Sequence, residues 1–368
     1  MSADEALKYR IAVSLIPGIG DVQGKRLVAY CGGPEAVFRE KKKNLLKVPG
    51  IGEVLAGSIH RKEIFERVEK EMAFIRQYQI QAMFYLDQGY PEKLRHCEDG
   101  PMILYYKGKA DLSQKRILSV VGTRKPTEYG KALCEQIVLG FADQGILIVS
   151  GLAYGVDTMA HRASLTAGLP TVGVLAHGLD LIYPFSNRTL AEKMLAKGGL
   201  ITEFMSGTKL NRDYFPRRNR IIAGIADATL VIESAGKGGA LITADIANSY
   251  NRDVFALPGR VDDPKSEGCN MLIRTNKAAL VRSADDICYS MGWEQSQVHL
   301  QIQRQLFSEM SEDERKVFLM LEEKKEADID DIFLNSGLTP SKVASILLKM
   351  EFEGLIKSLP GKRYRIIA

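Results

Sequence analysis

Glycine-rich turns that precede helical patterns are the feature of this sequence best suited to chemistry. The sequence contains three of these turns, and each follows an apolar run. Their residues are Gly122, Thr123, Arg124, Gly151, Gly155, Lys237, Gly238, Gly239 and, one helical turn later, Thr243. Glycine lets a backbone approach a ligand closely, and the free amides and dipole of a helix N-terminus attract an anion. Several such turns indicate a row of phosphates rather than one small nucleotide.

A basic segment accompanies the turns. Residues 209–220 carry five basic side chains and one acidic one, in a chain whose formal net charge is only +5. The candidate binding residues of this segment are Phe215, Arg217, Asn219 and Arg220. Guanidinium groups pair well with phosphates, and an aromatic face such as Phe215 or Tyr154 can stack on an unpaired base. We therefore expect the turns and this segment to form one pocket for a polyanion.

Several of these side chains have structural alternatives. Arg220 could instead pair with a core carboxylate such as Glu203 or Glu233. Phe215 could be a packed aromatic, and Asp157 at a helix start fits a simple capping role. These alternatives stay open from the sequence.

Alternating strand and helix patterns between residues 86 and 290 must position the turns. The predicted strands are 117–121, 146–150, 171–176, 200–204, 229–233 and 253–257, and helices begin near Tyr129, Asp157, Ser186, Arg217 and Leu241. Apolar strands that alternate with helices predict an α/β domain with a Rossmann-like, mostly parallel sheet covered on both faces. Such sheets bind ligands beyond the carboxyl ends of their strands, which is where the turns fall.

Two smaller modules flank this core. Residues 1–85 predict short helices broken by the repeated motifs IPGIG (16–20) and VPGIG (48–52). This all-helical segment resembles a helix-hairpin-helix or SAM-like module, whose turns either contact DNA or are merely compact. Residues 311–368 predict three helices and a hairpin, the pattern of a winged helix. A polar, glutamine-rich linker is expected over 291–310.

The predicted winged helix lacks a basic stripe. Along its presumed recognition helix, 339–354, Lys342 and Lys349 are offset by Glu351 and Glu353. Binding to a DNA duplex depends on neutralising phosphates, so the composition gives little support for it here. A protein-contact or dimer role is an equal alternative.

Composition places the chain among ordinary globular proteins. It has 368 residues, of which 45% are hydrophobic and 26% charged. Five scattered cysteines with no CxxC spacing argue against a disulfide framework and a zinc site. The first residues lack a signal-peptide pattern, and no apolar run is long enough to span a membrane. We expect a cytoplasmic protein without a cofactor, a metal or a membrane partner.

A family resemblance emerges from the motifs of the core. They are YPEKL (90–94), VGTRKPTEYG (121–130), SGLAYGVDTMAH (150–161), GLDLIYPFSN (178–187), LITEF (200–204), FPRRNRIIAG (215–224), GGALITADIA (238–247) and FALPGRVDDPKSEGCNMLI (255–273). From about Gln88 to Ser290 the sequence resembles the DNA-processing protein A family (DprA, also called Smf). Helical N-terminal modules and C-terminal winged helices also occur in that family.

The resemblance implies a function and a site. It implies a Rossmann-like homodimer that binds and protects single-stranded DNA and loads the RecA recombinase onto it in natural transformation or recombination. Carried over by position, the pocket comprises Gly122, Thr123, Arg124, Gly151, Gly155, Phe215, Arg217, Asn219, Arg220, Gly238, Gly239 and Thr243. Relatives usually have Ser-Gly-Ser at the last turn, where this chain has Lys237-Gly238-Gly239-Ala240. The change removes a hydroxyl donor and adds a lysine.

Two enzyme classes are the competing interpretations. A nucleotide phosphoribohydrolase on a similar fold would carry PGGxGTxxE, but GKGGALITADIA lacks the proline, the second Gly-Thr and the glutamate, and Asp245 does not fit the pattern. An NAD-dependent dehydrogenase would need GxGxxG after the first strand, and this motif is missing there. We therefore expect a binding protein without catalytic activity.

Overall fold

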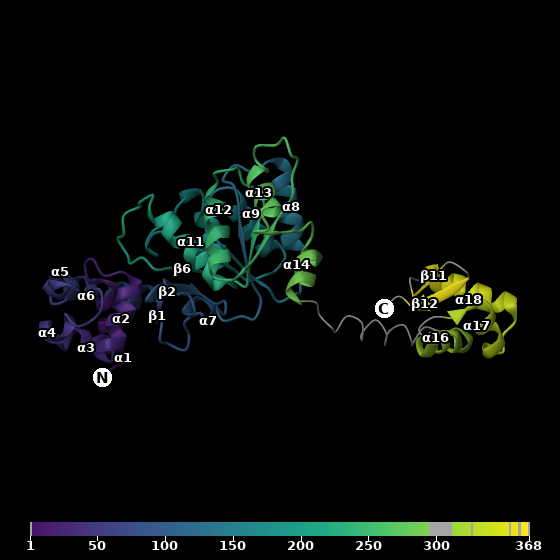
Figure 1. Cartoon of the computed structure of the whole chain (residues 1–368), viewed down its shortest axis with the longest axis horizontal. Coiled ribbons are helices and arrows are strands. Elements are labelled where there is room, and N and C mark those ends of the chain that lie inside the picture. Colours follow the sequence, from purple (N-terminus) through teal and green to yellow (C-terminus); the bar gives the residue numbers. More distant parts are fainter. Residues whose placement is uncertain (1, 294–310, 325–326, 353–354, 360–361, 367–368) are drawn as a thin grey trace. The chain divides into compact units, whose positions relative to one another are not determined.

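The computed structural model describes residues 2–293, 311–324, 327–352, 355–359 and 362–366. These residues form two compact units, one ending at Trp293 and one beginning after it (Figure 1). Most of the predicted linker, 294–310, lies outside the described residues. The first unit contains the helical module and the α/β core, and the second is the winged helix.

A nine-stranded sheet forms the centre of the first unit. Its strands are β1 (Gln81–Phe84), β2 (Ile103–Gly108), β3 (Ile117–Val121), β4 (Leu147–Ser150), β5 (Thr171–Val174), β6 (Gly199–Thr202), β7 (Ala228–Val231), β8 (Asp253–Ala256) and β9 (Ala279–Leu280). The strand order is β1-β2-β6-β5-β4-β3-β7-β8-β9. The strands from β3 to β9 are parallel to one another, while β2 pairs antiparallel with β6 and β1 pairs antiparallel with β2 at one edge. The predicted Rossmann-like, mostly parallel sheet is confirmed.

The chain reverses its direction of growth in the sheet at β3. After β3 it adds β4, β5 and β6 on one side, and then crosses back to add β7, β8 and β9 on the other. Such a reversal leaves a crevice at the carboxyl ends of the two central strands, which here are β3 and β7. This crevice is the expected position for a ligand.

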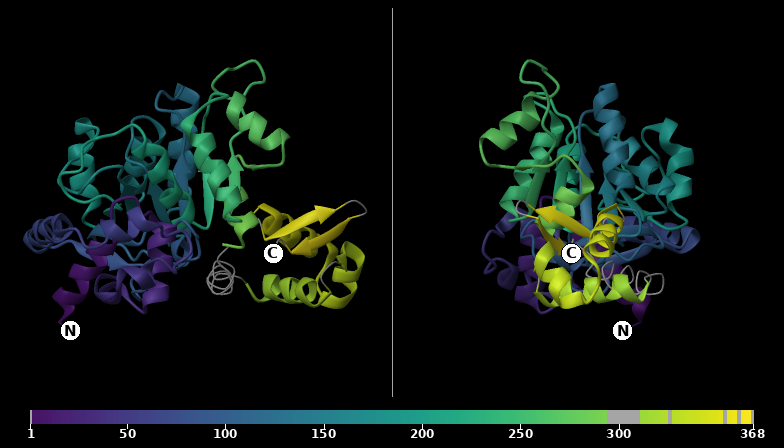
Figure 2. Two further views of the ribbon diagram at one scale, coloured as in Figure 1. Left: turned by 60° about the vertical axis from the view of Figure 1, so that its left-hand side comes forward. Right: turned by 90° about the vertical axis from the view of Figure 1, so that its right-hand side faces the viewer.

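Helices cover both faces of the sheet (Figure 2). They are α7 (Glu92–Arg95), α8 (Glu128–Leu139), α9 (Val156–Thr166), α10 (Arg188–Met194), α11 (Tyr214–Ile225), α12 (Gly239–Ser249), α13 (Glu267–Arg274) and α14 (Ala284–Met291), with a short 3₁₀ turn at Phe185–Asn187. One face buries Val121 and Val149 with α11, α12 and α13, and the other buries Val120 and Ile148 with α8, α9 and α14. Alternate strand residues therefore point into two separate cores.

Six helices of the described chain precede the sheet, as the N-terminal pattern predicts. They are α1 (Ala3–Ser14), α2 (Asp21–Cys31), α3 (Pro34–Arg39), α4 (Lys42–Leu45), α5 (Glu53–Ser58) and α6 (Lys62–Tyr78). Their apolar residues share one core with Phe84 of β1, Tyr105 of β2 and Met102, which directly precedes β2. The helical module is thus packed on the antiparallel edge of the sheet. Because β1 begins at Gln81, the sheet starts a few residues before the expected boundary at 85/86.

The second unit is the predicted winged helix. It contains α16 (Glu312–Lys324), β10 (Ala327–Asp328), α17 (Ile329–Ser336), α18 (Pro340–Phe352), β11 (Ile356–Leu359) and β12 (Arg363–Ile366). Its strands form one antiparallel sheet in the order β10-β12-β11. On α18, Lys342 pairs with Asp313 at 2.6 Å and Lys349 pairs with Glu314 at 2.7 Å. Both lysines of the recognition helix are therefore partly neutralised within the module.

Candidate nucleic-acid interface

A cleft of about 650 Å³ lies at the crevice between β3 and β7. It is bounded by the carboxyl ends of β3 and β7, the N-terminal half of α11 and the first turn of α12. Eight of the predicted binding residues line it: Gly122, Thr123, Arg124, Phe215, Asn219, Gly238, Gly239 and Thr243. Segments more than 100 residues apart in the sequence thus meet at one edge of the sheet, as the order of strands requires.

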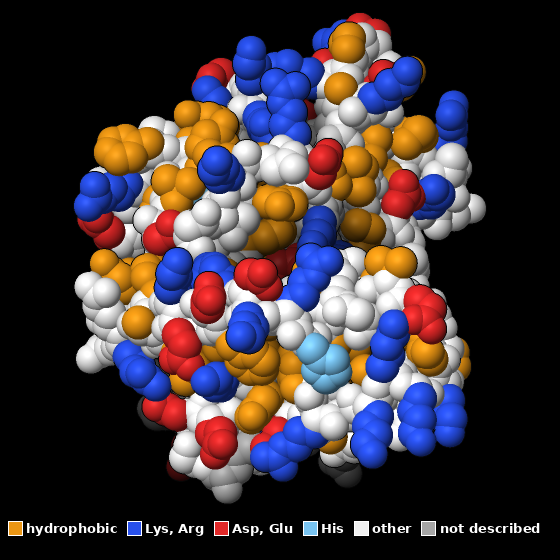
Figure 3. Space-filling model, turned by 90° about the vertical axis from the view of Figure 1, so that its left-hand side faces the viewer, with side chains coloured by type: hydrophobic (Ala, Val, Ile, Leu, Met, Phe, Trp, Pro, Cys, Tyr) orange, Lys and Arg blue, Asp and Glu red, His pale blue; other side chains and the backbone are white. Residues whose placement is uncertain are grey.

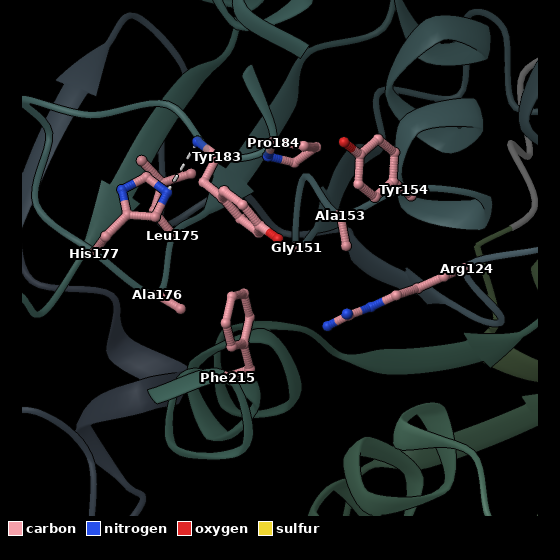
Figure 4. Close-up of a pocket in the computed structure, with 10 residues that line it drawn as sticks. All are labelled: Arg124, Gly151, Ala153, Tyr154, Leu175, Ala176, His177, Tyr183, Pro184 and Phe215. Carbon is pink, nitrogen blue, oxygen red and sulfur yellow. Dashed lines mark hydrogen bonds between the residues drawn. The ribbon is translucent and has the colours of Figure 1, made fainter. Parts of the chain in front are cut away.

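Arg124 and Phe215 form the polar and aromatic wall of the cleft. The Arg124 guanidinium carbon lies 5.4 Å from the centre of the Phe215 ring. The ring of Tyr183 lies 6.0 Å from that of Phe215, centre to centre. These residues also line an adjoining side pocket with Tyr154, and Figure 4 shows the Arg124 side chain pointing toward the Phe215 ring. Phe215 is thus exposed to the cleft on one side, and the wall offers both a cation and aromatic faces.

His177 holds the loop that carries Tyr183. Its Nδ1 lies 2.9 Å from the carbonyl oxygen of Gly178, and its Nε2 lies 3.3 Å from the backbone nitrogen of Tyr183. Burial lowers the pKa of His177. A neutral ring with its proton on Nδ1 satisfies both contacts, so His177 positions the aromatic wall instead of supplying charge.

The turn before α12 has its backbone open to the cleft. A side chain at Gly238 would overlap the Ser234 hydroxyl at 2.2 Å, so packing explains that glycine. A Cβ at Gly239 would meet nothing within 4 Å. Gly239 is the first residue of the 11-residue helix α12. The Gly238 amide donates to the Ala235 carbonyl oxygen and the Leu241 amide to that of Gly238, while the Gly239 amide precedes the hydrogen-bond ladder of the helix. Gly239 therefore leaves room for an anion at the helix N-terminus.

The predicted turn at 151–155 is satisfied internally. The Asp157 carboxylate accepts hydrogen bonds from the backbone amides of Gly151 at 3.1 Å and Ala153 at 3.3 Å. A Cβ at Gly155, whose φ is +79°, would lie 2.3 Å from the Thr123 carbonyl oxygen. These glycines are needed for close packing, and Asp157 occupies the position expected for a phosphate. The predicted capping role of Asp157 is wrong: the N-cap of α9 is Gly155, which makes no side-chain cap hydrogen bond, and Asp157 closes the turn that precedes the helix.

Gly122 also has a packing role. A Cβ there would approach the Val156 side chain to 2.6 Å. The neighbouring amide of Thr123 donates to the Glu233 carbonyl oxygen at 2.7 Å. Gly122 and Thr123 line the cleft, but their glycine and amide also serve the internal packing of this turn.

Arg218 forms a buried positive floor of the cleft. Its guanidinium donates to the Gly151 carbonyl oxygen at 2.6 Å and to the carbonyl oxygen of Val174. Burial lowers its pKa to about 10, against the raising effect of Asp157. Gly151 is required here as well, because a Cβ would overlap this guanidinium at 2.2 Å. Arg218 thus remains cationic near neutral pH and adds positive potential beneath the cleft.

Arg217 and Arg220 belong to an ion-pair cluster outside the cleft. Arg220 lies 2.6 Å from Glu203 and 3.1 Å from Asp21, and it also donates to the carbonyl oxygen of Asp99. Arg217 lies 2.5 Å from the same Glu203 oxygen. The Arg220 side chain is only 9% exposed. The expected phosphate contact of Arg220 is therefore replaced by its alternative, the pair with Glu203, because this buried carboxylate needs a cation.

One predicted binding residue lies beside the cleft, and three residues that line the cleft were not predicted. Lys237 is exposed in the turn before Gly238, but it does not line the cleft. The sequence did not mark Arg212, Tyr183 or Ile242, which do line it. Arg212 lies within the basic segment and Tyr183 within a family motif, so both carried a signal. Ile242 gave none, since its exposure on α12 depends on packing.

No metal or membrane feature accompanies the cleft. In the described ranges, no group of three or more His, Cys, Asp or Glu side chains is placed to hold a metal ion. None of the helices described is both long and apolar enough to cross a membrane.

Comparisons with known proteins agree over nearly the whole chain. Residues 81–292 match the family described as DNA recombination-mediator protein A, and residues 306–362 match the DprA winged helix domain. The chain is 34% identical to Protein Smf of Synechocystis sp. over 401 aligned residues, which cover 99% of each chain. It is 39% identical to DNA processing protein DprA of Streptococcus pneumoniae over 55% of this chain and 71% of that protein.

Two solved structures share the architecture. DNA processing protein A from Streptococcus pneumoniae superposes with a TM-score of 0.66 and 31% identity, covering 78% of this chain and 98% of that one. DNA processing protein A from Helicobacter pylori, whose structure addresses a single-stranded DNA binding mode, gives a TM-score of 0.53 and 26% identity. That match covers 58% of this chain and 96% of the other.

Proposed function

Because the chain belongs to the DNA recombination-mediator protein A (DprA) family, we propose that it binds single-stranded DNA in the cleft between β3 and β7. The observation that carries the proposal is the Arg124–Phe215–Tyr183 wall. It combines a cation with aromatic faces, which is the combination that holds a flexible strand of unpaired bases.

Each part of the cleft has a task in this proposal. Arg124 neutralises one phosphate, and backbone amides in the first turn of α12 at Gly239 donate hydrogen bonds to another. Phe215 and Tyr183 stack on bases without reading their identity. Asn219 and Thr243 lie on the cleft lining and supply further polar contacts. The buried Arg218 attracts the polyanion without touching it.

The DNA-bound protein acts with two partners in this proposal. A homodimer holds a longer tract than one chain does, and the complex protects incoming DNA and passes it to the RecA recombinase in the cytoplasm. The family relationship supports this role in natural transformation or recombination. A pull-down of RecA by the full chain, with and without oligothymidine, and a sedimentation measurement of the chain test the two partners separately.

We propose that the cleft performs no catalysis. A phosphoribohydrolase would need the glutamate of its motif, and Asp245 is the carboxylate that comes closest to that position in the sequence. Asp245 pairs with Lys277 at 2.8 Å on the exposed side of α12 and does not line the cleft. Incubation with AMP should release no free adenine. Release of adenine that disappears in Asp245→Asn would establish the phosphoribohydrolase alternative.

The experiment that tests DNA binding is a titration of a 20-nucleotide oligothymidine at several salt concentrations. Arg124→Ala should weaken binding and lower the slope of log K against log salt by about 0.7, the value for one neutralised phosphate on a single strand. Lys197→Ala, at the opposite edge of the sheet, is the matched control and should leave the slope unchanged. A full chain that fails to bind the oligomer at low salt would refute the proposal.

A further inference from the structure

The outward side of α18 in the winged helix carries a stripe without charge. The inward side of α18 is buried in the core of the module. On the opposite side, four exposed residues follow one another at intervals of four, three and four: Ser341, Ser345, Leu348 and Phe352. Residues with this spacing lie in one row along an α-helix. Leu348 is 56% exposed and Phe352 is 84% exposed, so two large apolar side chains face solvent. We call this row the α18 stripe.

The α18 stripe is unsuited to a DNA backbone. Binding of phosphates requires cations, and Lys and Arg side chains are abundant on the face of the molecule shown in Figure 3. The stripe itself has none. The lysines beside it are paired within the module, Lys342 with Asp313 at 2.6 Å and Lys349 with Glu314 at 2.7 Å. An apolar row between balanced charges is typical of a contact with protein.

The order of side-chain sizes makes the α18 stripe complementary to itself. Its small residues, Ser341 and Ser345, lie as far before the centre of the row as Phe352 and Leu348 lie after it. Two copies that pack antiparallel about a two-fold axis at this centre therefore bring each large side chain onto a small one. Phe352 meets Ser341 of the second copy, and Leu348 meets its Ser345. A contact of this kind uses the same patch on both chains, as a closed two-fold interface requires.

The charges beside the stripe also match in this arrangement. Lys342 and Lys349 are seven residues apart and lie on the same side of α18, each with its own carboxylate. The two-fold axis brings this side of one copy next to the same side of the other, in reversed order. Lys342 of one copy then approaches the Glu314–Lys349 pair of the other. Each lysine meets a carboxylate of the second copy, and the combined row has no net charge.

We propose that the α18 stripe packs on the same stripe of a second copy of this chain, antiparallel about a two-fold axis. One helix face is smaller than the roughly 800 Å² per partner of a standard interface, so the contact is weak by itself. In the proposed homodimer, two winged helices belong to one particle, which raises their effective concentration. The inference rests on that homodimer for its strength, and it assigns a role to a module that the single-strand cleft does not use.

The test uses the full chain with Ser345→Cys, treated with a short bismaleimide. Ser345 lies beside the two-fold axis, so its two copies come close together in the pair. A linkage of this position to itself joins two chains, and peptide mass spectrometry identifies it. Of the native cysteines, Cys31 is partly exposed and the other four are buried. Linkage of Cys31 to itself therefore measures random collision, and we expect linkage at position 345 in clear excess over it.

Charges placed in the stripe should separate the two copies. In the Ser345→Cys chain, Leu348→Glu together with Phe352→Glu should reduce the linkage at least about tenfold, because burial of a Leu or a Phe side chain contributes enough for this factor. The matched control is Leu334→Glu, which changes an exposed leucine of α17 and should leave the linkage unchanged. All three side chains face solvent, so these variants should keep the melting curve of the unmodified chain.

An exchange of sizes tests the antiparallel register. Ser341→Phe alone should weaken the linkage because two Phe side chains then meet, and Phe352→Ser alone should weaken it because two small side chains meet. The double variant, and an equal mixture of the two single variants, should each recover it, since every contact again joins one Phe to one Ser. A merely structural role of these residues gives no recovery on mixing.

Three results would overturn the inference. They are linkage at position 345 no greater than that at Cys31, linkage that survives Leu348→Glu/Phe352→Glu, and size exchange without recovery. Weaker binding of a DNA duplex by Leu348→Glu/Phe352→Glu, with linkage unchanged, would assign the stripe to DNA and also overturn it. Failures of the proposed function look different. If the homodimer is wrong, the Leu348→Glu/Phe352→Glu chain sediments as a monomer, and if the cleft is wrong, Arg124→Ala leaves oligothymidine binding unchanged.

Discussion

Replacement of Arg220 by alanine should destabilise the α/β core while leaving the salt dependence of DNA binding unchanged. The Glu203 side chain is 3% exposed and lies 2.6 Å from the Arg220 guanidinium. Removal of one partner of a buried ion pair costs about 3–5 kcal/mol, because the remaining charge is left without compensation. Arg217 still contacts Glu203 in the variant, but it is 49% exposed. We therefore expect the lower end of this range, about 3 kcal/mol.

Urea denaturation measures this destabilisation with an internal probe. Trp293 is the single tryptophan of the chain, and it is buried in the core of α8, α9 and α14. Its fluorescence should report a midpoint lowered by about 1 M for a slope near 3 kcal/mol per M. The double variant Glu203→Gln/Arg220→Gln should recover part of the stability, since both charges are gone.

A DNA titration of the same variant decides whether Arg220 contacts a phosphate or only pairs with Glu203. Oligothymidine binding by Arg220→Ala, measured well below its unfolding midpoint, should keep the slope of the unmodified chain. An unchanged urea midpoint together with a shallower salt dependence would contradict this expectation. It would mean that Arg220 contacts a phosphate and that Glu203 does not need it.

Three further predictions concern single residues. Phe215→Ala should weaken oligothymidine binding by about 1–3 kcal/mol, the value of one stacked base, and Phe215→Tyr should restore it in the same titration. Burial lowers the pKa of His161 to about 3 from an ordinary 6.5. His161 therefore takes up a proton at a higher pH in the unfolded chain than in the folded one, and the free energy of unfolding decreases as the pH is lowered below about 6.5. The destabilisation from His161 at pH 5 is about 2 kcal/mol, and urea midpoints should show a smaller pH dependence in His161→Met. Gly155→Ala should lower the free energy of unfolding by at least about 2 kcal/mol, because φ is +79° and the new Cβ would overlap the Thr123 carbonyl; an unchanged midpoint would show that this turn is not constrained.

The sequence predicted the parallel core because its strands are apolar on both faces. Each of the six predicted strands is found, with its end shifted by at most two residues. The strands β1, β2 and β9 were not predicted. The first two form an antiparallel pair joined by a segment with only one turn of helix, and β9 has two residues. β9 lies between α13 and α14, but a strand of two residues is too short to give an apolar run in the sequence.

The sequence located the candidate residues at one edge of the sheet but could not tell which of their groups are free there. Arg124, Phe215 and Gly239 were predicted to share one pocket from their residue types, and all three line the cleft. The partners of the other candidates come from contacts that no local pattern shows. Arg220 and Asp21 are 199 residues apart in the chain, and the Asp157 carboxylate turns back onto Gly151. Such pairing depends on the finished fold, so a basic segment alone could not separate a phosphate ligand from a structural ion pair.

Photo-crosslinking of oligothymidine to the full chain, followed by identification of the modified peptides, tests single-strand binding in the cleft. We expect crosslinks in the peptides that contain Tyr154, Tyr183 and Phe215, because these aromatic side chains line the cleft and its side pocket. Crosslinks confined to the helical module or to the winged helix would contradict the assignment of the cleft.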